Sequence, residues 1–198
     1  MLAPGSSPSV QTFESVLAAA RTGAKWACTQ LWLEYSPAVA AFLKARGSRE
    51  PEDLTSEVFL ALFDQLPKFE GGPAELRSFI FSIAYRRLVD ELRMRTRRGE
   101  AAEFTVDIDP RSVDSAETAA IQNLGDADAA RLLDELPQDQ RDVMVLRIVA
   151  DLTVEQVAEV LGKRAGAVKA LQRRALENLR KKLAPTRTPA SPSGDSEK

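Results

Sequence analysis

Apolar residues recur at helical intervals along most of the chain, a pattern that predicts amphipathic helices. The clearest example is residues 136–183, which read LPQDQRDVMVLRIVADLTVEQVAEVLGKRAGAVKALQRRALENLRKKL and predict three short helices. The last two are joined by a tight turn at 163–166, and the last helix is heavily basic. This arrangement is typical of a helix-turn-helix.

The middle helix of this stretch has a recognisable start and end. Thr153 and Gln156 have the spacing of a capping box, in which each side chain pairs with the backbone amide of the other residue. Gly162 follows the last apolar residue, as a left-handed C-terminal cap requires. The final helix then carries an apolar stripe formed by Val168, Leu171, Ala175 and Leu179.

Small and cationic side chains lie off this stripe and in the turn before it. Such a face suits a helix that enters the major groove, because Arg pairs with guanine and both Lys and Arg neutralise phosphate. The alternative is a solvated basic helix end whose cations only favour the helix dipole. The candidate DNA-contacting residues are Lys163, Arg164, Lys169, Ala170, Arg173 and Arg174.

A second helical pattern covers residues 11–98. Its first long helix is expected to be interrupted or bent at Pro37. Pro51 suits the first turn of the next helix, whose acidic residues dominate its outer side. A long helix then runs from about Glu75, after a loop rich in glycine and proline.

Residues 99–126 differ in character, with seven acidic side chains against the single cation Arg111 and little apolar periodicity. This composition predicts a flexible acidic linker. The ends, 1–10 and 184–198, are rich in Pro, Ser or Thr and are predicted to be disordered. A second helical domain covers 127–183. The predicted fold class is therefore all-α, with two small helical domains joined by the linker.

The formal net charge is −2, so the distribution of charge must carry any argument for nucleic acid. Eight cations and one anion lie within 163–182, and six cations and two anions lie within 86–98. The chain has no histidine, and Cys28, the only cysteine, is expected to be a small core residue. We therefore expect no metal site, no cofactor and no enzymatic activity.

No apolar run approaches the length of a membrane-spanning helix. The N-terminus lacks the basic and apolar regions of a signal peptide. We expect a cytoplasmic protein without membrane insertion.

Two blocks of the sequence resemble the extracytoplasmic-function (ECF) group of the sigma-70 family, the smallest bacterial transcription initiation factors. EDLTSEVFLALFDQLPKF and LRSFIFSIAYRRLVDELRMRTRR resemble region 2 of that family. LPQDQRDVMVLRIVADLTVEQVAEVLG and GAVKALQRRALENLRKKL resemble region 4 with its helix-turn-helix. The resemblance covers about residues 28–183, with the blocks in the order of the family.

The resemblance implies that the chain binds core RNA polymerase. In the family, a region 2 helix docks on the clamp helices of the β′ subunit, and the β flap is a second contact. An acidic exposed face suits a basic partner, although a solvated face is the alternative interpretation. The corresponding residues here are Asp53, Leu54, Glu57, Leu60, Asp64 and Gln65.

The resemblance also implies promoter contacts. Region 4 would bind the −35 element through the cationic helix, and region 2 would bind and help open the −10 element. Opening needs phosphate contacts and a pocket for an extruded base. Residues 69–74 match the family's base-capturing loop, whereas Phe79 and Phe81 are expected in the core. The candidate phosphate contacts are Arg77, Arg86, Arg87, Arg93 and Arg95.

This sequence departs from the family at several positions. Arg86 stands where many members have Asn, Phe79 where many have Trp, and Ala167 where Thr is usual. Leu171-Gln172-Arg173 replaces a common Arg-Leu-His. The promoter sequences read by other members therefore do not carry over to this chain.

The predicted function is that of a sigma factor, which recognises the −35 and −10 elements and assists strand opening while the polymerase does the chemistry. An anti-sigma factor is the expected regulator. A stand-alone helix-turn-helix regulator is one alternative, but it leaves the first domain unexplained. An adaptor that no longer binds promoters is another, because Arg86 and Ala167 depart from the family.

Overall fold

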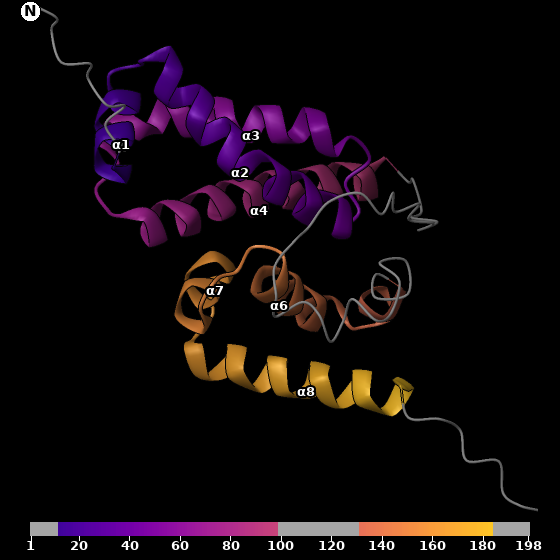
Figure 1. Cartoon of the computed structure of the whole chain (residues 1–198). Helices are drawn as coiled ribbons and strands as arrows, with labels where there is room; N and C mark the ends of the chain where they lie inside the picture. Colours follow the sequence, from indigo (N-terminus) through magenta and orange to yellow (C-terminus); the bar gives the residue numbers. More distant parts are fainter. Residues whose placement is uncertain (1–11, 99–130, 184–198) are drawn as a thin grey trace, which may run out of the picture.

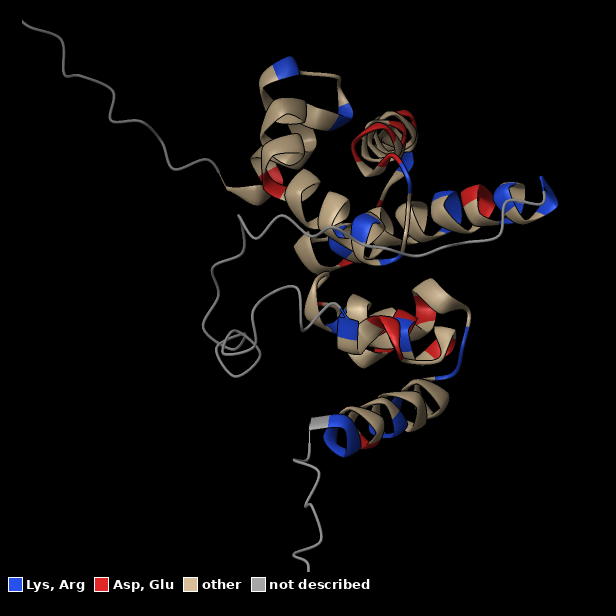
Figure 2. Ribbon diagram, turned by 90° about the vertical axis from the view of Figure 1, so that its right-hand side faces the viewer, with Lys and Arg blue, Asp and Glu red and all other residues tan. Residues whose placement is uncertain are grey.

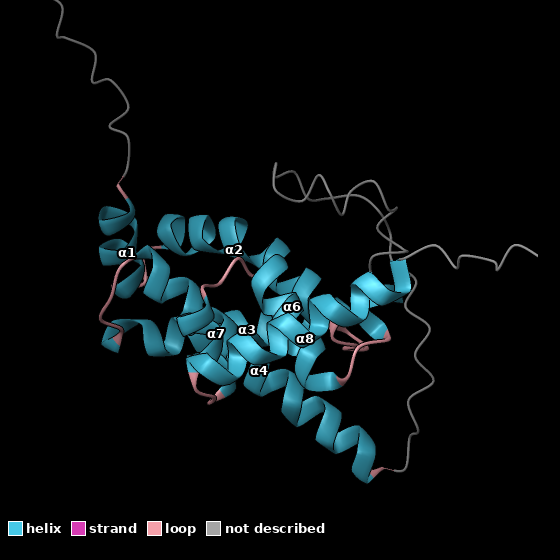
Figure 3. Ribbon diagram, turned by 90° about the horizontal axis from the view of Figure 1, so that it is seen from below, coloured by secondary structure: helices cyan, strands magenta, loops and turns pink. Residues whose placement is uncertain are grey.

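The computed structural model of the chain describes residues 12–98 and 131–183 (Figure 1). Every regular element within these ranges is a helix, which confirms the all-α prediction (Figure 3). The segments predicted to be disordered or to form the linker, 1–10, 99–126 and 184–198, lie outside the described residues.

The described residues form two groups of helices, one above the other in Figure 1. The N-terminal domain, residues 12–98, contains α1 (Phe13–Arg21), α2 (Lys25–Ala45), α3 (Pro51–Gln65), the 3₁₀ turn η1 (Leu66–Lys68) and α4 (Pro73–Arg97). The C-terminal domain, residues 131–183, contains α6 (Gln138–Ile148), α7 (Val154–Leu161) and α8 (Ala165–Leu183). Helix α8 lies on the side of the C-terminal domain that is farther from α2, α3 and α4 (Figure 1).

Local sequence signals set the starts of the helices in the N-terminal domain. Pro51 and Pro73 occupy the first turns of α3 and α4, where the missing amide hydrogen would have no helical partner. The Glu75 carboxylate accepts a hydrogen bond from the Gly72 amide at 3.0 Å. Glu75 therefore caps α4 from within its first turn. The helix begins at Pro73, slightly before the start predicted at about Glu75.

Helix α1 is part of the folded domain. Its Val16, Leu17 and Ala20 are at most 5% exposed and belong to the common apolar cluster. The helix starts at Thr12, whose side chain accepts a hydrogen bond from the Ser15 amide at 3.3 Å. The N-terminal domain thus includes a helix that precedes the segment resembling region 2.

Helix α2 continues through Pro37, so of the two expected effects, an interruption or a bend, the interruption does not occur. Proline lacks the amide hydrogen that would bond to the Leu33 carbonyl one turn earlier. The Leu33 side chain is 67% exposed, so water can serve this carbonyl. The opposite side of α2, which includes Tyr35 and Val39, is buried. Burial of that side outweighs the lost backbone hydrogen bond.

The core of the N-terminal domain lies between α2, α3 and α4. Phe42 of α2 and Phe81 of α4 are fully buried, and their rings meet edge to face with centroids 5.6 Å apart. Trp32 of α2 makes a similar contact with Phe59 of α3 at 4.7 Å. Most of the apolar positions predicted from periodicity are buried here: Leu31, Tyr35, Val39, Phe42, Leu43, Val58, Leu62, Ile80, Ile83 and Leu88.

The two domains share one buried apolar cluster. Leu146 of α6 and Val157 of α7 belong to the same cluster as Phe42 and Phe81. Helix α4 packs against α7, and α2 contacts α6. The sequence predicts two helical domains but not their docking, because periodicity marks a buried face without identifying the surface that covers it.

Replacing Leu62 with Ala is expected to lower the free energy of unfolding by about 3 kcal/mol, because it removes a fully buried side chain and leaves a cavity. Urea unfolding of the full chain measures the change. The control is Leu60→Ala on the same helix, where the side chain is 71% exposed. Equal losses in the two variants would contradict the described packing of α3.

Candidate nucleic-acid interface

The helix-turn-helix has the local structure that its sequence predicts. The Thr153 hydroxyl accepts from the Gln156 amide at 3.2 Å, and the Gln156 side-chain carbonyl accepts from the Thr153 amide at 2.8 Å. Gly162 ends α7 in the left-handed region with φ +62°, and the Lys163 amide donates to the Ala158 carbonyl at 2.8 Å. The capping box and the glycine cap are confirmed, and α8 begins at Ala165 after a turn shorter than predicted.

Helix α8 buries one side and exposes the other. Val168 and Ala175 are fully buried, while Leu171 and Leu179 pack against the core from its edge. Because α8 lies on the outer side of the C-terminal domain, the face opposite these residues is open (Figure 1). Of the residues predicted to contact the −35 element, Ala170 and Lys163 are half-buried, and the exposed ones are Arg164, Lys169, Arg173 and Arg174.

The cations of this surface form only weak local contacts. Arg173 lies 3.8 Å from Glu177 one turn later, and both side chains are largely exposed. Lys163 lies 3.5 Å from Asp139. Exposed pairs of this kind contribute about 0–1 kcal/mol, so these side chains remain available to phosphate. Figure 2 shows further Lys and Arg at the C-terminal end of α8.

Helix α3 exposes an acidic face. Asp53, Glu57, Leu60 and Asp64 follow one another at helical spacing and are all exposed. Gln65 is also exposed and donates to the Ala61 carbonyl at 3.0 Å, whereas Leu54 is half-buried. The predicted polymerase-binding residues therefore form one surface, apart from Leu54 at its edge.

Three of the five arginines predicted to contact the −10 element are exposed on α4. Arg86 donates to the Ser82 carbonyl at 3.0 Å, which holds it along the helix. Arg87 lies 3.8 Å from Glu57 of α3, with both side chains about half exposed. Arg93 lies 3.7 Å from Asp90. Figure 2 shows that Lys and Arg gather toward the C-terminal end of α4.

The other two arginines, Arg77 and Arg95, contact protein. The Arg77 guanidinium lies 5.5 Å from the ring centroid of Tyr35. It also donates to the Ala150 carbonyl of the C-terminal domain at 3.2 Å. Arg95 donates to the Gly47 carbonyl, which follows α2, at 2.8 Å. The structure therefore separates this predicted set into an exposed group and two side chains engaged in internal contacts.

The loop at 69–74 is held by contacts on both sides. The Phe69 ring stacks on Phe79 with centroids 5.2 Å apart, and the Phe69 carbonyl accepts a hydrogen bond from Arg21 of α1. Phe81 is fully buried, as predicted, whereas Phe79 is only partly buried at the edge of the core. The loop thus has a defined backbone next to a partly exposed aromatic pair.

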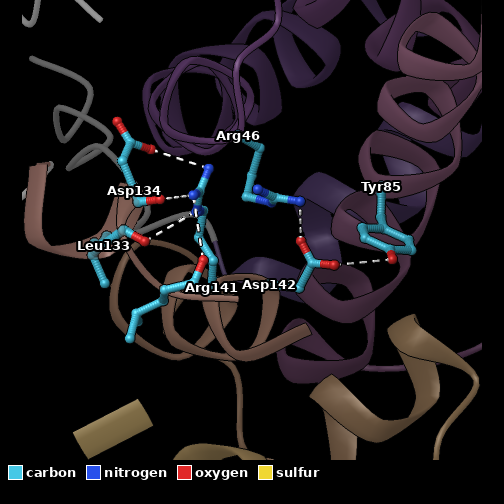
Figure 4. A network of polar contacts seen from close by, with 7 residues as sticks. Arg46, Tyr85, Leu133, Asp134, Arg141 and Asp142 are labelled. Atoms are coloured by element: carbon cyan, nitrogen blue, oxygen red, sulfur yellow. Dashed lines mark hydrogen bonds and ion pairs between the residues drawn. The ribbon is translucent and has the colours of Figure 1, made fainter. Parts of the chain in front are cut away.

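A buried polar contact that the sequence did not predict joins the two domains (Figure 4). It is formed by Arg46, Tyr85 and Asp142, which we call the interdomain network. The Arg46 guanidinium pairs with one carboxylate oxygen of Asp142. The Tyr85 hydroxyl donates to the other oxygen at 3.3 Å. The only signal in the sequence is that Asp142 directly precedes the apolar run VMVL of α6.

Burial shifts the pKa values of two groups in this network, Asp142 and Tyr85. Desolvation raises the pKa of the Asp142 carboxyl above its ordinary value, while Arg46 and the Tyr85 hydroxyl act in the opposite direction. Desolvation and the neighbouring Asp142 raise the pKa of Tyr85 to about 12. The Tyr85 hydroxyl therefore keeps its proton near neutral pH and remains a donor to Asp142.

A capped helix-turn-helix with a cationic outer face defines the class of the protein as a helix-turn-helix DNA-binding protein. Residues 132–181 match the sequence family "Sigma-70, region 4", and residues 31–98 match "Sigma-70 region 2". Helix α1 and the first turns of α2 precede the matched segments.

Individual relatives agree with this assignment. The chain is 32% identical over 154 residues to the ECF RNA polymerase sigma factor ShbA of Streptomyces griseus, a match that covers 73% of this chain and 81% of ShbA. It is 27% identical over 194 residues to the ECF RNA polymerase sigma factor SigD of Mycobacterium tuberculosis, covering 92% and 89% of the two chains. The chain belongs to the ECF sigma factors of the sigma-70 family. It is therefore a transcription initiation factor.

Solved structures show the same fold. The sigma factor RpoE in complex with the anti-sigma factor NepR from Bartonella quintana matches with a TM-score of 0.65 and 25% identity, over 80% of this chain and 98% of RpoE. CnrH in complex with the cytosolic domain of CnrY matches with a TM-score of 0.62 and 23% identity, over 86% and 96% of the two chains.

Among the helices of residues 12–98 and 131–183, none combines the length and the apolar character needed to cross a membrane.

Replacing Gly162 with Ala is expected to destabilise the C-terminal domain by about 1–2 kcal/mol, because a Cβ disfavours the left-handed backbone at this position. Thermal unfolding of the full chain measures the loss. Gly166→Ala is the matched control, since Gly166 lies in the first turn of α8 with open space around it and no positive φ. An unchanged melting temperature for Gly162→Ala would contradict the left-handed cap.

Proposed function

We propose that this ECF sigma factor binds core RNA polymerase through the acidic face of α3, reads the −35 element with α8, and binds and opens the −10 element with α4 and the loop 69–74. The observation that carries the proposal is the separation of charge. Exposed acidic side chains gather on α3, whereas exposed cations gather on α4 and α8. A protein partner for the acidic surface and a nucleic-acid partner for the cationic surfaces would account for this separation.

The acidic face of α3 suits the basic surface of a protein partner. Asp53, Glu57 and Asp64 surround Leu60, which is 71% exposed. A large exposed apolar side chain within a charged rim is typical of a protein contact, since the centre of an interface is depleted of charge. The charges would orient the encounter, and Leu60 would supply buried area. We assign this surface to the β′ clamp helices, and we take the β flap as a second contact.

The exposed face of α8 suits the major groove. Lys169, Arg173 and Arg174 lie on it without deep ion pairs, next to the small Ala170. A small residue lets the helix approach the base edges, while the arginines supply bidentate donors. Arg164 and Lys163 at the turn would position the helix through phosphate contacts.

The −10 surface combines the exposed arginines of α4 with the loop 69–74. Arg86, Arg87 and Arg93 are exposed on α4 and would contact the sugar–phosphate backbone. The partly exposed pair of Phe69 and Phe79 beside the loop offers a ring edge to an extruded base. The held backbone of the loop favours the proposal, because a preorganised pocket loses less conformational entropy when it binds a base.

Control by an anti-sigma factor is part of the proposal. Two of the structural relatives were solved with a bound protein: RpoE in complex with the anti-sigma factor NepR, and CnrH in complex with the cytosolic domain of CnrY. A factor with these partners would work in the cytoplasm, together with the polymerase and the promoter.

Neutralising the α3 face with Asp53→Asn and Glu57→Gln is expected to lower run-off transcription by purified bacterial core polymerase at least about tenfold, because one lost polar contact of about 1.4 kcal/mol corresponds to that factor. The assay uses genomic fragments as templates. The matched control is Glu14→Gln with Glu155→Gln, two exposed acids on other helices. Specific duplex binding without any polymerase-dependent transcript would instead favour a stand-alone regulator.

Replacing Arg174 with Ala is expected to relax discrimination at one position of the −35 element by about 1–3 kcal/mol, because a base contact specifies sequence. Competition binding with single-base variants of the element measures the change. Lys181→Ala, at the exposed end of α8, serves as the comparison and should weaken binding evenly. An even loss for Arg174→Ala as well would reassign Arg174 to a phosphate contact.

A further inference from the structure

Helix α1 contacts the loop 69–74 although it lies outside the segment that matches region 2. Arg21, the last residue of α1, donates a hydrogen bond from its Nη2 atom to the Phe69 carbonyl. Phe69 directly follows η1 and is the first residue of the loop. The matched segment begins only at residue 31. A helix that precedes this segment therefore holds the loop to which we assign base capture.

The Arg21 side chain is itself held in place. Its helix is anchored by Val16, Leu17 and Ala20, which are at most 5% exposed. Its Nε atom is buried and has no hydrogen-bond partner among the described residues. Burying a polar nitrogen without a partner costs free energy, and an apolar side chain would fill the same space without that cost. The contact with the Phe69 carbonyl is what an arginine supplies here and an apolar side chain could not.

Phe69 transmits this restraint to the rest of the loop. Its ring stacks on Phe79 with centroids 5.2 Å apart, and it also lies close to Gly71. A Cβ on Gly71 would lie 2.9 Å from Phe69 Cζ and 2.8 Å from the Glu75 Cβ atom. The loop therefore has no room for a side chain at this point. A displacement of Phe69 moves one ring of the partly exposed pair and changes the space around the loop backbone.

Capture of an extruded base depends on this geometry. A pocket that is ordered before the DNA arrives loses less conformational entropy on binding. If the loop were released, ordering the backbone of one residue again would lower the affinity for the strand about tenfold. The Arg21 guanidinium is already engaged with a protein carbonyl. Its contribution to binding would therefore come through the loop and not through phosphate.

We propose that Arg21 is a positioning residue for promoter opening, which presets the loop 69–74 through its hydrogen bond to the Phe69 carbonyl. Helix α1 thereby takes part in reading the −10 element without touching it. The inference rests on the proposed function, since it concerns the same base-capturing loop. It adds a residue outside the matched segments to those that determine specificity at the −10 element.

The first test measures discrimination at the −10 element by holoenzyme assembled from the full chain and bacterial core polymerase. The probe is a fluorescent single-stranded oligonucleotide with the −10 region of a promoter mapped by run-off transcription, together with its single-base variants. Arg21→Ala should weaken binding of the promoter sequence about tenfold and reduce discrimination at the captured base by a similar factor. Arg21→Lys, which keeps a donor for the carbonyl, should lie between Arg21→Ala and the unchanged protein. Binding of a −35 duplex should not change.

Salt dependence separates positioning from a direct DNA contact. If Arg21 contacted phosphate, its removal would reduce the slope of log affinity against log salt concentration and weaken all sequences evenly. Positioning through the loop leaves that slope unchanged. The matched control is Lys25→Ala, which removes one exposed cation at the start of α2 and should leave discrimination unchanged.

A second variant disturbs the same loop from its other side. Gly71→Ala places a methyl group against Phe69 and Glu75, and it should reduce discrimination at the same base. Because both changes act on one loop, the effects of Arg21→Ala and Gly71→Ala should be less than additive in the double variant. Fully additive effects would contradict action through the loop.

Hydrogen exchange of the full chain shows whether Arg21→Ala leaves α1 folded. The Ala24 amide is hydrogen-bonded to a carbonyl at the end of α1, and the Gly72 amide is hydrogen-bonded within the first turn of α4. Exchange at Gly72 should accelerate about tenfold in the variant, whereas exchange at Ala24 should not change. If both accelerate, α1 has come loose, and Arg21→Lys and Gly71→Ala then decide the question.

Two results would overturn the inference. One is a folded Arg21→Ala variant whose holoenzyme retains full discrimination at every −10 position. The other is an even loss for all sequences together with a smaller salt slope, which would make Arg21 a phosphate contact. In both cases wild-type holoenzyme that binds the oligonucleotide and transcribes leaves the proposed function standing. Holoenzyme that does neither is the separate result that would refute the proposed function.

Discussion

The arrangement of the two domains depends on a buried ion pair between Arg46 and Asp142. Apolar surfaces such as those of α4 and α7 attract one another without fixing a single register, because burial of area is not directional. A buried charge pair is directional, since it is tolerated only when the partner and a further donor, here Tyr85, stand at the right places. The apolar cluster therefore supplies most of the attraction between the domains, and the ion pair selects one geometry.

Within that geometry the helix-turn-helix serves two purposes at once. Helix α7 faces the N-terminal domain through Gln156 and Glu159, while α8 turns its cations outward. Gly162 ends α7 with a positive φ, and the buried Val168 anchors α8 in the core. A unit of two helices can therefore hold a protein contact on one side and present the proposed DNA-binding surface on the other.

Local features of this molecule could be predicted from the sequence, and long-range ones could not. The capping box at Thr153 and the cap at Gly162 depend on neighbouring residues, so their spacing was sufficient. Pro37 was expected to interrupt or bend α2, and packing of the buried side of that helix keeps it continuous through the proline. The contacts of Asp142 and Arg77 could not be predicted. The charge of each residue is visible in the sequence, but its partner, Arg46 or the Ala150 carbonyl, lies far away along the chain.

The buried pair also bears on how freely the two halves of such a protein can be exchanged. Helical domains joined by a long connecting segment look like interchangeable modules, and chimaeras between relatives are an obvious way to combine promoter specificities. Here a graft that brings in a foreign C-terminal domain without an acid in place of Asp142 would leave Arg46 facing an apolar surface. The two halves are in this respect a matched set, and residues on opposite sides of their boundary would have to be inherited together.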